Sequence, residues 1–256
     1  MKRSSLFWQN HFKENLIVQR VNWDINPKIT DDEKRKIIYS LKAWQLGETS
    51  DGSHLLAAAT KYAKRINEPA YPEAVKLFIK EEQKHGNNLG RYIDLIGEKR
   101  LARDWGDSLF RKIRYFNTSM ELWTITVIIV ESAAQIFYQA LHDATNCDLL
   151  KSICRDILID EAHHIKFQNE RLHSIMSQKS IYLRALSVSG YWMLFLGTIH
   201  AIWLAHKKAF KAGGVDKQEF MRRMHFKFFN SLKFSYSPSV ELQNEHLFES
   251  SLAKSI

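Results

Sequence analysis

Two short stretches of the sequence repeat one pattern of two acidic residues followed by a histidine. "EEQKHGNN" spans residues 81–88 and "DEAHHIKF" spans residues 160–167, and each places a Glu three residues before a His. Positions three residues apart lie on the same face of an α-helix. A carboxylate and an imidazole on one helical face can bind a metal ion together. The repeat therefore predicts metal chemistry shared between two helices.

The apolar residues around each repeat indicate which acid and which histidine face the core. A helical stripe around the first repeat runs through Tyr71, Val75, Phe78, Glu82, His85 and Leu89. The stripe around the second repeat runs through Leu150, Cys154, Ile157, Glu161, His164 and Gln168. Glu82 is therefore preferred over Glu81, which lies about 100° further round an ideal helix. By the same argument His164 is preferred over His163.

Two further carboxylates are expected to face the core. Glu131 follows nine uncharged residues, "LWTITVIIV", and a lone carboxylate in such a setting is costly unless it is paired or binds a metal. Glu48 lies on a weaker stripe, where Asp51 and His54 compete with it. The stripe of Glu131 continues through Thr124, Val127, Ala134 and Tyr138, and that of Glu48 through Trp44, Leu55, Ala59 and Tyr62.

The spacing of these residues predicts a dinuclear site. Glu48 precedes Glu82 by 34 residues and Glu131 precedes Glu161 by 30, so each pair fits two antiparallel helices joined by a turn. Two copies of Glu…Glu-x-x-His form the ligand set of a carboxylate-bridged metal pair in a four-helix bundle. Four buried carboxylates cannot all stay ionised unless cations neutralise them. One Glu-x-x-His alone would more often be an ordinary surface or core pair. Ligands without thiolate favour two iron ions, with manganese as the alternative.

Composition predicts an all-α protein, because 45% of residues are hydrophobic and only 10 are Gly and 4 are Pro. Residues 1–34 are expected to form an N-terminal extension, in which Thr30 caps a helix together with Glu33. Residues 35–233 form the helical domain, with a bundle over about 35–177 and extra helices over about 181–233; residues 234–256 form a peripheral tail. The expected helices cover 31–66, with a break near Gly47 or Gly52, then 72 to the low nineties, 116–145 and 148–177.

Two features bear on compartment and membrane. Cys147 and Cys154 form no Cys-x-x-Cys pair, and the first residues lack a signal-peptide pattern, so a reducing, cytoplasmic location is expected. Residues 185–205 contain no Asp, Glu, Lys or Arg and are long enough to cross a bilayer. Ser, Gly, Thr and His residues dilute this stretch, so a buried helix is preferred over a span. His200 within it is expected to be a hydrogen-bonded core residue.

Positive charge is concentrated late in the chain. The net charge is +9, and residues 206–229 carry seven Lys/Arg against two acids. A solvated helix face explains this simply; an acidic partner protein, a phosphate-bearing substrate or membrane headgroups are the functional alternatives. No nucleic-acid-binding module is recognisable, so a nucleic-acid partner is not expected.

The paired motifs over residues 41–170 resemble the ferritin-like di-iron carboxylate superfamily. Residues 81–97 are similar to the second-helix segment of soluble acyl-carrier-protein desaturases, and residues 147–164 to their fourth-helix segment. The resemblance implies that Asp160 orients a ligand histidine. It also implies that Glu48 and Glu131 are terminal ligands and that Glu82 and Glu161 are bridging ligands. His85 and His164 would then cap the two metals.

The chain also departs from known branches of that superfamily. It is shorter than the desaturases. Ile157 stands where arylamine N-oxygenases have an extra ligand His, and Ala134 or Gln135 stands where bacterial hydroxylases have a Thr. Cage ferritins lack a counterpart to residues 181–233. The added layer includes Tyr191, Trp192, Phe195 and Trp203, which form either extra core or the wall of an apolar pocket.

The resemblance and the ligand pattern predict an O2-dependent di-iron oxidase or oxygenase that desaturates, hydroxylates or N-oxygenates an apolar or carrier-bound substrate. No flavin or nicotinamide fingerprint is present, so an external electron donor is expected. The basic segment, including Arg222 and Arg223, is expected to dock an acidic carrier protein. A homodimer and peripheral membrane contact are further alternatives. The competing functions are a ferroxidase without organic substrate and a membrane-associated helical protein anchored by residues 185–233.

Overall fold

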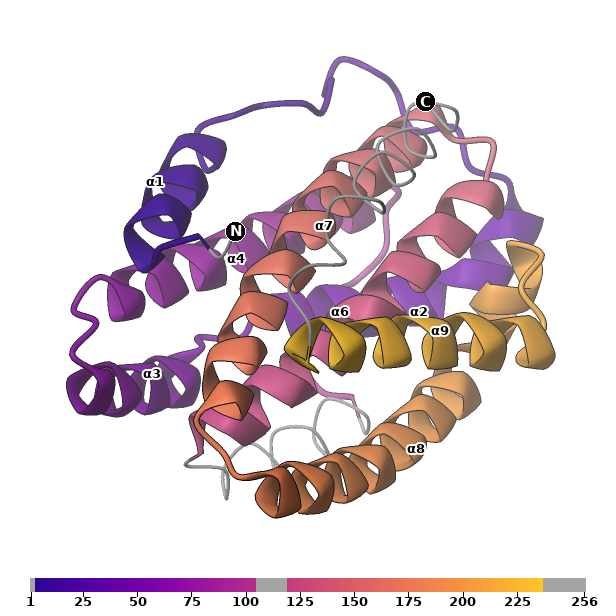
Figure 1. Ribbon diagram of the computed structural model, residues 1–256. Helices are drawn as coiled ribbons and strands as arrows, with labels where there is room; N and C mark the ends of the chain where they lie inside the picture. The colour runs from indigo at the N-terminus through magenta and orange to yellow at the C-terminus, as the bar shows by residue number, and fades with distance from the viewer. Residues whose placement is uncertain (1–2, 105–118, 237–256) are drawn as a thin grey trace.

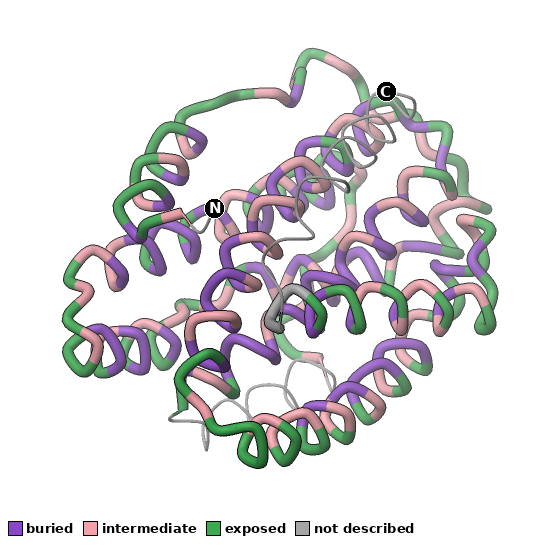
Figure 2. The backbone as a smooth tube through the Cα atoms, in the orientation of Figure 1, coloured by how far each residue is buried: buried purple, intermediate pink, exposed green. Residues whose placement is uncertain are grey.

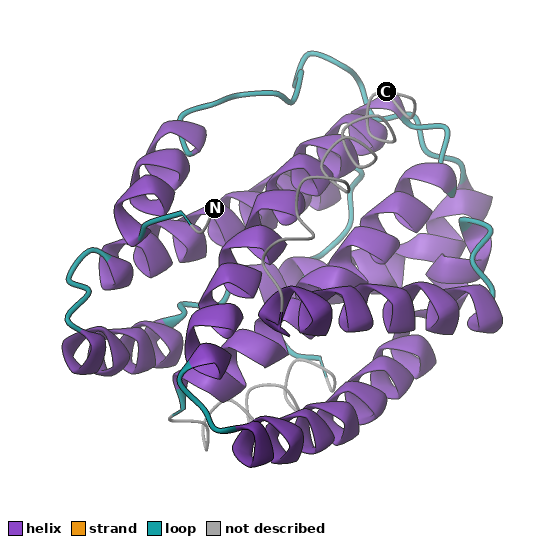
Figure 3. Cartoon of the chain, viewed as in Figure 1, coloured by secondary structure: helices purple, strands orange, loops and turns teal. Residues whose placement is uncertain are grey.

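The computed structural model describes residues 3–104 and 119–236 (Figure 1). Within these ranges every regular element is a helix, and Figure 3 shows no strand there. The predicted all-α fold is therefore confirmed. The helices are α1 (Ser5–Asn15), α2 (Asp31–Glu48), α3 (Ser53–Ile66), α4 (Tyr71–Leu95), α6 (Met120–Asp143), α7 (Asp148–Ser177), α8 (Ile181–Ala212) and α9 (Lys217–Tyr236).

Four long helices form the bundle that positions the acidic repeats. Helix α2 packs against α4, α6 packs against α7, and α4 contacts α7. The expected break after α2 is present: Gly52 has φ +63°, and a Cβ there would lie 2.6 Å from Ile79 Cδ1. Glycine is therefore required both by the left-handed backbone and by the close packing. The predicted capping box of Thr30 and Glu33 begins α2.

Helix boundaries agree with expectation where the chain is described. Helix α7 has the predicted bounds, and α4 begins one residue before the predicted start. The predicted third bundle helix began at residue 116, but residues 116–118 lie outside the described part, and α6 begins at Met120. Helix α9 continues to Tyr236, into the segment expected to be a peripheral tail. The rest of that tail, residues 237–256, also lies outside the described part.

Helix α1 was not predicted, and it packs along α4 (Figure 1). Its apolar contact is made by Trp8 and Phe12, which are almost fully buried. The ring of Phe12 lies 5.3 Å from that of Phe167 and 5.9 Å from that of His164. The N-terminal segment is therefore part of the wall around the second acidic repeat.

Helices α8 and α9 form a further layer over the bundle. Helix α8 packs on α6 and α2, and α9 crosses α7 and α6 (Figure 1). The prediction that residues 185–205 form a buried helix is wrong, because one face of α8 is covered and the other is exposed (Figure 2). His200 is exposed rather than in the core, and its Nδ1 lies 2.8 Å from the carbonyl oxygen of Leu196.

Both α6 and α8 are long and apolar enough to cross a membrane by length and composition. They differ in burial: 72% of the apolar window of α6 is buried, against 28% of that of α8. Helix α6 is therefore the central helix of the bundle, and α8 is a surface helix of equal apolar character.

Candidate metal centre

The bundle brings all six predicted ligand residues to one level. They form two groups that share Glu82, and within each group the candidate ligand atoms lie within 4.8 Å of one another. The first group is Glu82, Glu131, Glu161 and His164, and the second is Glu48, Glu82 and His85. Glu48 is the inward group of its stripe, whereas Asp51 and His54 are exposed. The helices α2, α4, α6 and α7 thus each contribute a carboxylate.

Both histidines direct Nδ1 toward the carboxylates. His164 Nδ1 lies 2.7 Å from Glu82 Oε1 and 3.8 Å from Glu161 Oε2. His85 Nδ1 lies 4.0 Å from the other oxygen of Glu161, Oε1. The two oxygens of Glu161 therefore face different histidines, which is the arrangement that a bridging carboxylate needs.

The opposite nitrogen of each histidine meets a carboxylate from the other helix. His85 of α4 has Nε2 3.0 Å from Asp160 Oδ2 of α7. His164 of α7 has Nε2 2.7 Å from Glu81 Oε2 of α4. The two acids of each doublet therefore have different positions. The second acid, Glu82 or Glu161, joins the central cluster. The first acid, Glu81 or Asp160, orients the histidine of the partner helix. Glu81 lies outside the cluster, as the stripe argument predicted, but it is fully buried.

The N-terminal segment joins these two outer carboxylates. Asn15 Nδ2 donates to Glu81 Oε1 at 2.6 Å and to Asp160 Oδ1 at 2.8 Å. Arg20 donates to Asp160 Oδ1 at 2.9 Å and to Asp156 Oδ1 at 2.8 Å, and it also donates to the side-chain oxygen of Asn15. We call Asn15 and Arg20 the N-terminal bridge. This bridge was not expected, because no helix was predicted before residue 31.

Burial and mutual repulsion hold protons on the inner carboxylates. Burial, with the charge of Glu131, raises the pKa of Glu82 well above its ordinary value. Burial, with the charge of Glu161, does the same to the pKa of Glu131. Burial raises the pKa of Glu161 to about 7. Carboxylates so close together in a dry core cannot all be ionised without a cation.

The pKa values of the histidines and outer carboxylates are shifted toward the charged forms, unlike those of the inner carboxylates. Burial alone would lower the pKa of His164, but Glu82, Glu161 and Glu81 outweigh it and raise that pKa. The pKa of His85 is raised in the same way, chiefly by its hydrogen bond to Asp160. Burial would raise the pKa of Asp160, but its bonds to His85 and Asn15 keep that pKa below its usual range. The outer acids are therefore anions that favour protonated or metal-bound imidazole.

The central atoms suit a metal pair. Among the described residues, several buried atoms that face the cluster form no hydrogen bond: both oxygens of Glu161 and Nδ1 of His85. Nδ1 of His164 and Oε1 of Glu82 meet only each other, at 2.7 Å. Buried polar atoms without partners are costly, and a cation removes that cost by binding them. The donors are carboxylate oxygen and imidazole nitrogen, which suit iron and manganese. Cys147 and Cys154 are free and form no part of either group.

Tyr138 supports the carboxylate of α2. Its hydroxyl donates to Glu48 Oε1 at 2.6 Å, and the residue is fully buried. Tyr138 lies on the predicted stripe of Glu131, but helical periodicity alone does not predict that it reaches a carboxylate of another helix.

The added aromatic layer is packed as core. Phe195 stacks on Phe228 of α9 with ring centroids 4.2 Å apart, and Trp203 lies parallel to Phe210 at 5.9 Å. Trp192 contacts Phe195 and Phe228, and the hydroxyl of Tyr191 donates to Glu121. These contacts favour extra core over the wall of a substrate pocket.

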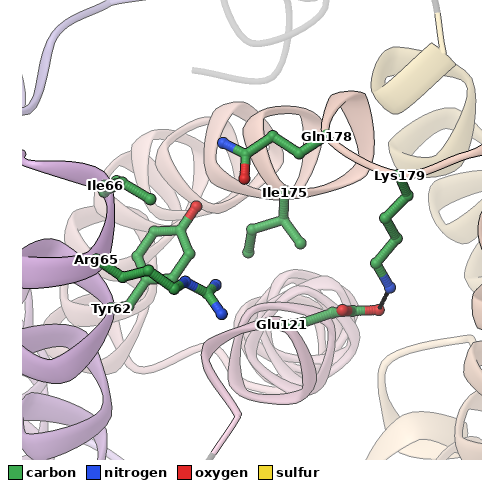
Figure 4. Close-up of a pocket in the computed structure, with 7 residues that line it drawn as sticks. All are labelled: Tyr62, Arg65, Ile66, Glu121, Ile175, Gln178 and Lys179. Atoms are coloured by element: carbon green, nitrogen blue, oxygen red, sulfur yellow. Dashed lines mark hydrogen bonds and ion pairs between the residues drawn. The ribbon is translucent and has the colours of Figure 1, made fainter.

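An open pocket of about 540 Å³ lies elsewhere, between α3, α6 and the end of α7 (Figure 4). Its lining residues are Tyr62, Arg65, Ile66, Glu121, Ile175, Gln178 and Lys179. Gln178 is fourteen residues beyond His164, which corresponds to about 20 Å along a helix. This pocket is therefore remote from the cluster, and the ion pair of Lys179 with Glu121 at 2.5 Å closes one side of it.

Comparison with known proteins adds information on the fold. No protein-family model and no curated protein matches the chain. A solved structure of an R2-like ligand-binding oxidase variant with an aerobically reconstituted Mn/Fe cofactor superposes with a TM-score of 0.62. The two proteins are 15% identical, over 91% of this chain and 94% of that chain. The chain has the fold of these oxidases.

A second variant of such an oxidase, with an anaerobically reconstituted Mn/Fe cofactor, gives a TM-score of 0.61 at 15% identity, over 91% of this chain and 93% of that chain. The predicted ferritin-like helical bundle with additional C-terminal helices is thus confirmed. The closer resemblance to acyl-carrier-protein desaturases stays a prediction.

Proposed function

We propose that this protein is an O2-dependent oxidase or oxygenase with a dinuclear centre of two iron ions or of manganese and iron. The observation that carries the proposal is the pair of residue groups that share Glu82, with buried carboxylate and imidazole atoms facing one another within 4.8 Å in each group. The structurally similar oxidases were reconstituted with a Mn/Fe cofactor, which supports the choice of metals.

The six residues take distinct roles in this proposal. Glu48 and Glu131 would each hold one metal, Glu82 and Glu161 would be shared between the two, and His85 and His164 would bind through Nδ1. When bound, the metal pair supplies the reduction of O2 and the oxidising power for the substrate. Glu81 and Asp160 accept hydrogen bonds from the Nε2–H groups, which fixes the tautomer that leaves Nδ1 free to bind.

The surrounding side chains keep water from the site. Phe12 and Phe78 lie against the ring of His164, and Ile157 and Ala134 are fully or almost fully buried beside the cluster on α7 and α6. Such a dry site strengthens the interaction between metals and carboxylates. It also favours an apolar substrate, free or presented by a carrier protein. Electrons would come from an external donor.

Anaerobic loading with Fe(II), followed by exposure to O2, tests the proposal. We expect about two metal ions per chain, O2 consumption and oxidation of an organic ligand detected by mass spectrometry. Glu161→Ala should lose metal, because it removes the bridge. The matched control is Glu170→Gln on the same helix, which is buried but binds Trp8 Nε1 at 2.7 Å instead of the cluster.

The possible outcomes distinguish the alternatives. Two metals retained by Glu161→Ala would refute the role of Glu161. O2 consumption that yields only oxidised iron, with no organic product, would identify a ferroxidase. Wild-type protein that binds neither iron nor manganese would refute the dinuclear site.

A further inference from the structure

The outward face of α8 is uncharged over most of its length. Seven exposed positions at helical spacing form what we call the outer stripe: Tyr182, Leu186, Ser189, Met193, Gly197, His200 and Leu204. Tyr182 is 86% exposed, and Leu186 and Met193 are each 71% exposed. The stripe is about 33 Å long at the rise of an α-helix. Ile181 and Leu183 extend it at the start of the helix, where they are also exposed.

This face is unusual for a helix that contacts water. The outer side of a surface helix normally carries charged residues. Helix α8 contains no Asp or Glu, and no Lys or Arg lies between Arg184 and Lys207. Its inner side is occupied, because Phe195, Ile199 and Phe210 pack in the core. An exposed, uncharged helix face with large apolar side chains such as Tyr182, Leu186, Met193 and Leu204 marks a candidate interaction site.

Positive charge flanks the outer stripe at its C-terminal end. Lys207, Lys208 and Lys211 are exposed, and none forms an ion pair within the described part of the chain. Two cations of α9 are already engaged, because Arg222 and Arg223 both bind Glu219, at 2.7 and 2.6 Å. The three lysines of α8 are available to a partner of opposite charge.

We propose that α8 docks the protein on the surface of an anionic lipid bilayer. The apolar side chains of the outer stripe would enter the boundary between headgroups and acyl chains, and Lys207, Lys208 and Lys211 would meet anionic headgroups. Because the inner face of α8 is packed on the bundle, the helix lies in the plane of the surface and does not cross it. An apolar stripe beside a cluster of unpaired lysines is the pattern of such helices.

Charge also argues against the other occupants. In a two-fold contact of α8 with α8, the lysines of one copy would face either the lysines or the Arg184 end of the other, and neither helix offers an acid. An acidic carrier protein could pair with the lysines, but it would leave the uncharged stripe without an apolar partner. A bilayer satisfies both parts of the surface at once.

Vesicle flotation of the full-length, metal-loaded protein tests this proposal. We expect binding to vesicles of phosphatidylcholine with 30% phosphatidylglycerol, and at least tenfold weaker binding to phosphatidylcholine alone. The variant Leu186→Glu/Met193→Glu should lose binding. The matched control, Leu6→Glu/Leu95→Glu, adds the same charge at two exposed apolar residues on α1 and α4 and should bind as wild type does. All four side chains are exposed, so folding and metal content should be unchanged.

Charge dependence gives a second readout. Lys207→Ala and Lys208→Ala should each weaken binding to anionic vesicles about fivefold. Raising the salt concentration from 0.1 to 1 M should weaken it further, because the Debye length falls from about 10 to about 3 Å. Equal binding to neutral and anionic vesicles, or equal loss in the control variant, would overturn the proposal. A dimer abolished by Leu186→Glu/Met193→Glu, or binding of an acidic carrier protein, in the absence of vesicle binding would overturn it in favour of that partner.

Discussion

Replacing Asn15 with leucine tests whether the N-terminal bridge orients both metal-binding histidines. The substitution keeps the branched shape and the number of side-chain heavy atoms, and it removes the hydrogen bonds to Glu81 and Asp160. A hydrogen bond to a charged group contributes about 1.5–3 kcal/mol. Loss of two such bonds should therefore lower the free energy of unfolding by about 3 kcal/mol, the lower end of the sum. The lower end applies because Arg20 still donates to Asp160 in the variant.

The effect on metal binding should be larger than for an ordinary outer hydrogen bond. Loss of a group that orients a metal ligand typically lowers affinity 10–100-fold. Asn15 contacts the carboxylates of both His85 and His164, so we expect the upper end of that range, about 2.7 kcal/mol. Competition with a chelator measures the affinity, and denaturant unfolding of the metal-free protein measures the loss of stability separately.

Ser5→Ala is the matched control. Ser5 is buried at the other end of α1, where it donates to Glu68 Oε1 at 2.9 Å, far from the acidic doublets. Its loss should weaken the docking of α1 by about 1 kcal/mol and leave metal affinity within about twofold. If Ser5→Ala lowers metal affinity as much as Asn15→Leu does, then α1 acts only by packing, and the argument for the bridge fails.

Three further predictions concern other parts of the site and fold. Tyr138→Phe removes the hydrogen bond to Glu48 and should lower metal affinity about tenfold, measured by the same competition; unchanged affinity would show that Glu48 needs no such support. Metal binding should release protons and should strengthen as pH rises. The reason is that Glu82, Glu131 and the two histidines, whose pKa values are raised, hold protons that the metal displaces. Calorimetry in two buffers of different ionisation enthalpy would detect the proton release, and no net release would refute the prediction. Gly213→Ala should lower the free energy of unfolding by about 3 kcal/mol, because its Cβ would lie 2.0 Å from the carbonyl oxygen of Ala140. Gly197→Ala, which has open space around it, should raise the free energy of unfolding by about 0.5–1 kcal/mol. Equal effects of the two substitutions in denaturant unfolding would contradict this reasoning.

The centre of the site could be predicted because its residues lie on regular helices. A period of 3.6 residues placed Glu82 and His85 on one face of α4, and the separation of Glu131 from Glu161 matched two helices and a turn. The observed bounds of α7 are those predicted, residues 148–177.

The outer part of the site could not be predicted in this way. Apolar periodicity identifies one covered face of a helix, but α1 also covers the neighbouring face of α4, and Glu81 is buried there. Helix α1 itself is short, with Leu6 and Phe7 exposed beside the buried Trp8 and Phe12, so its apolar periodicity is indistinct. For α8, composition could not tell a core helix from one whose apolar face lies outside.

The crossed pairing of the acidic doublets makes the two halves of the chain dependent on each other. Glu81 serves the histidine of α7, and Asp160 serves the histidine of α4. A change to the first acid of either doublet therefore impairs the histidine contributed by the opposite half. A chimaera that joined the first half of this chain to the second half of a distant relative could keep both Glu-x-x-His repeats intact and still lose the orientation of a histidine. The two doublets have to be inherited, or redesigned, as one unit.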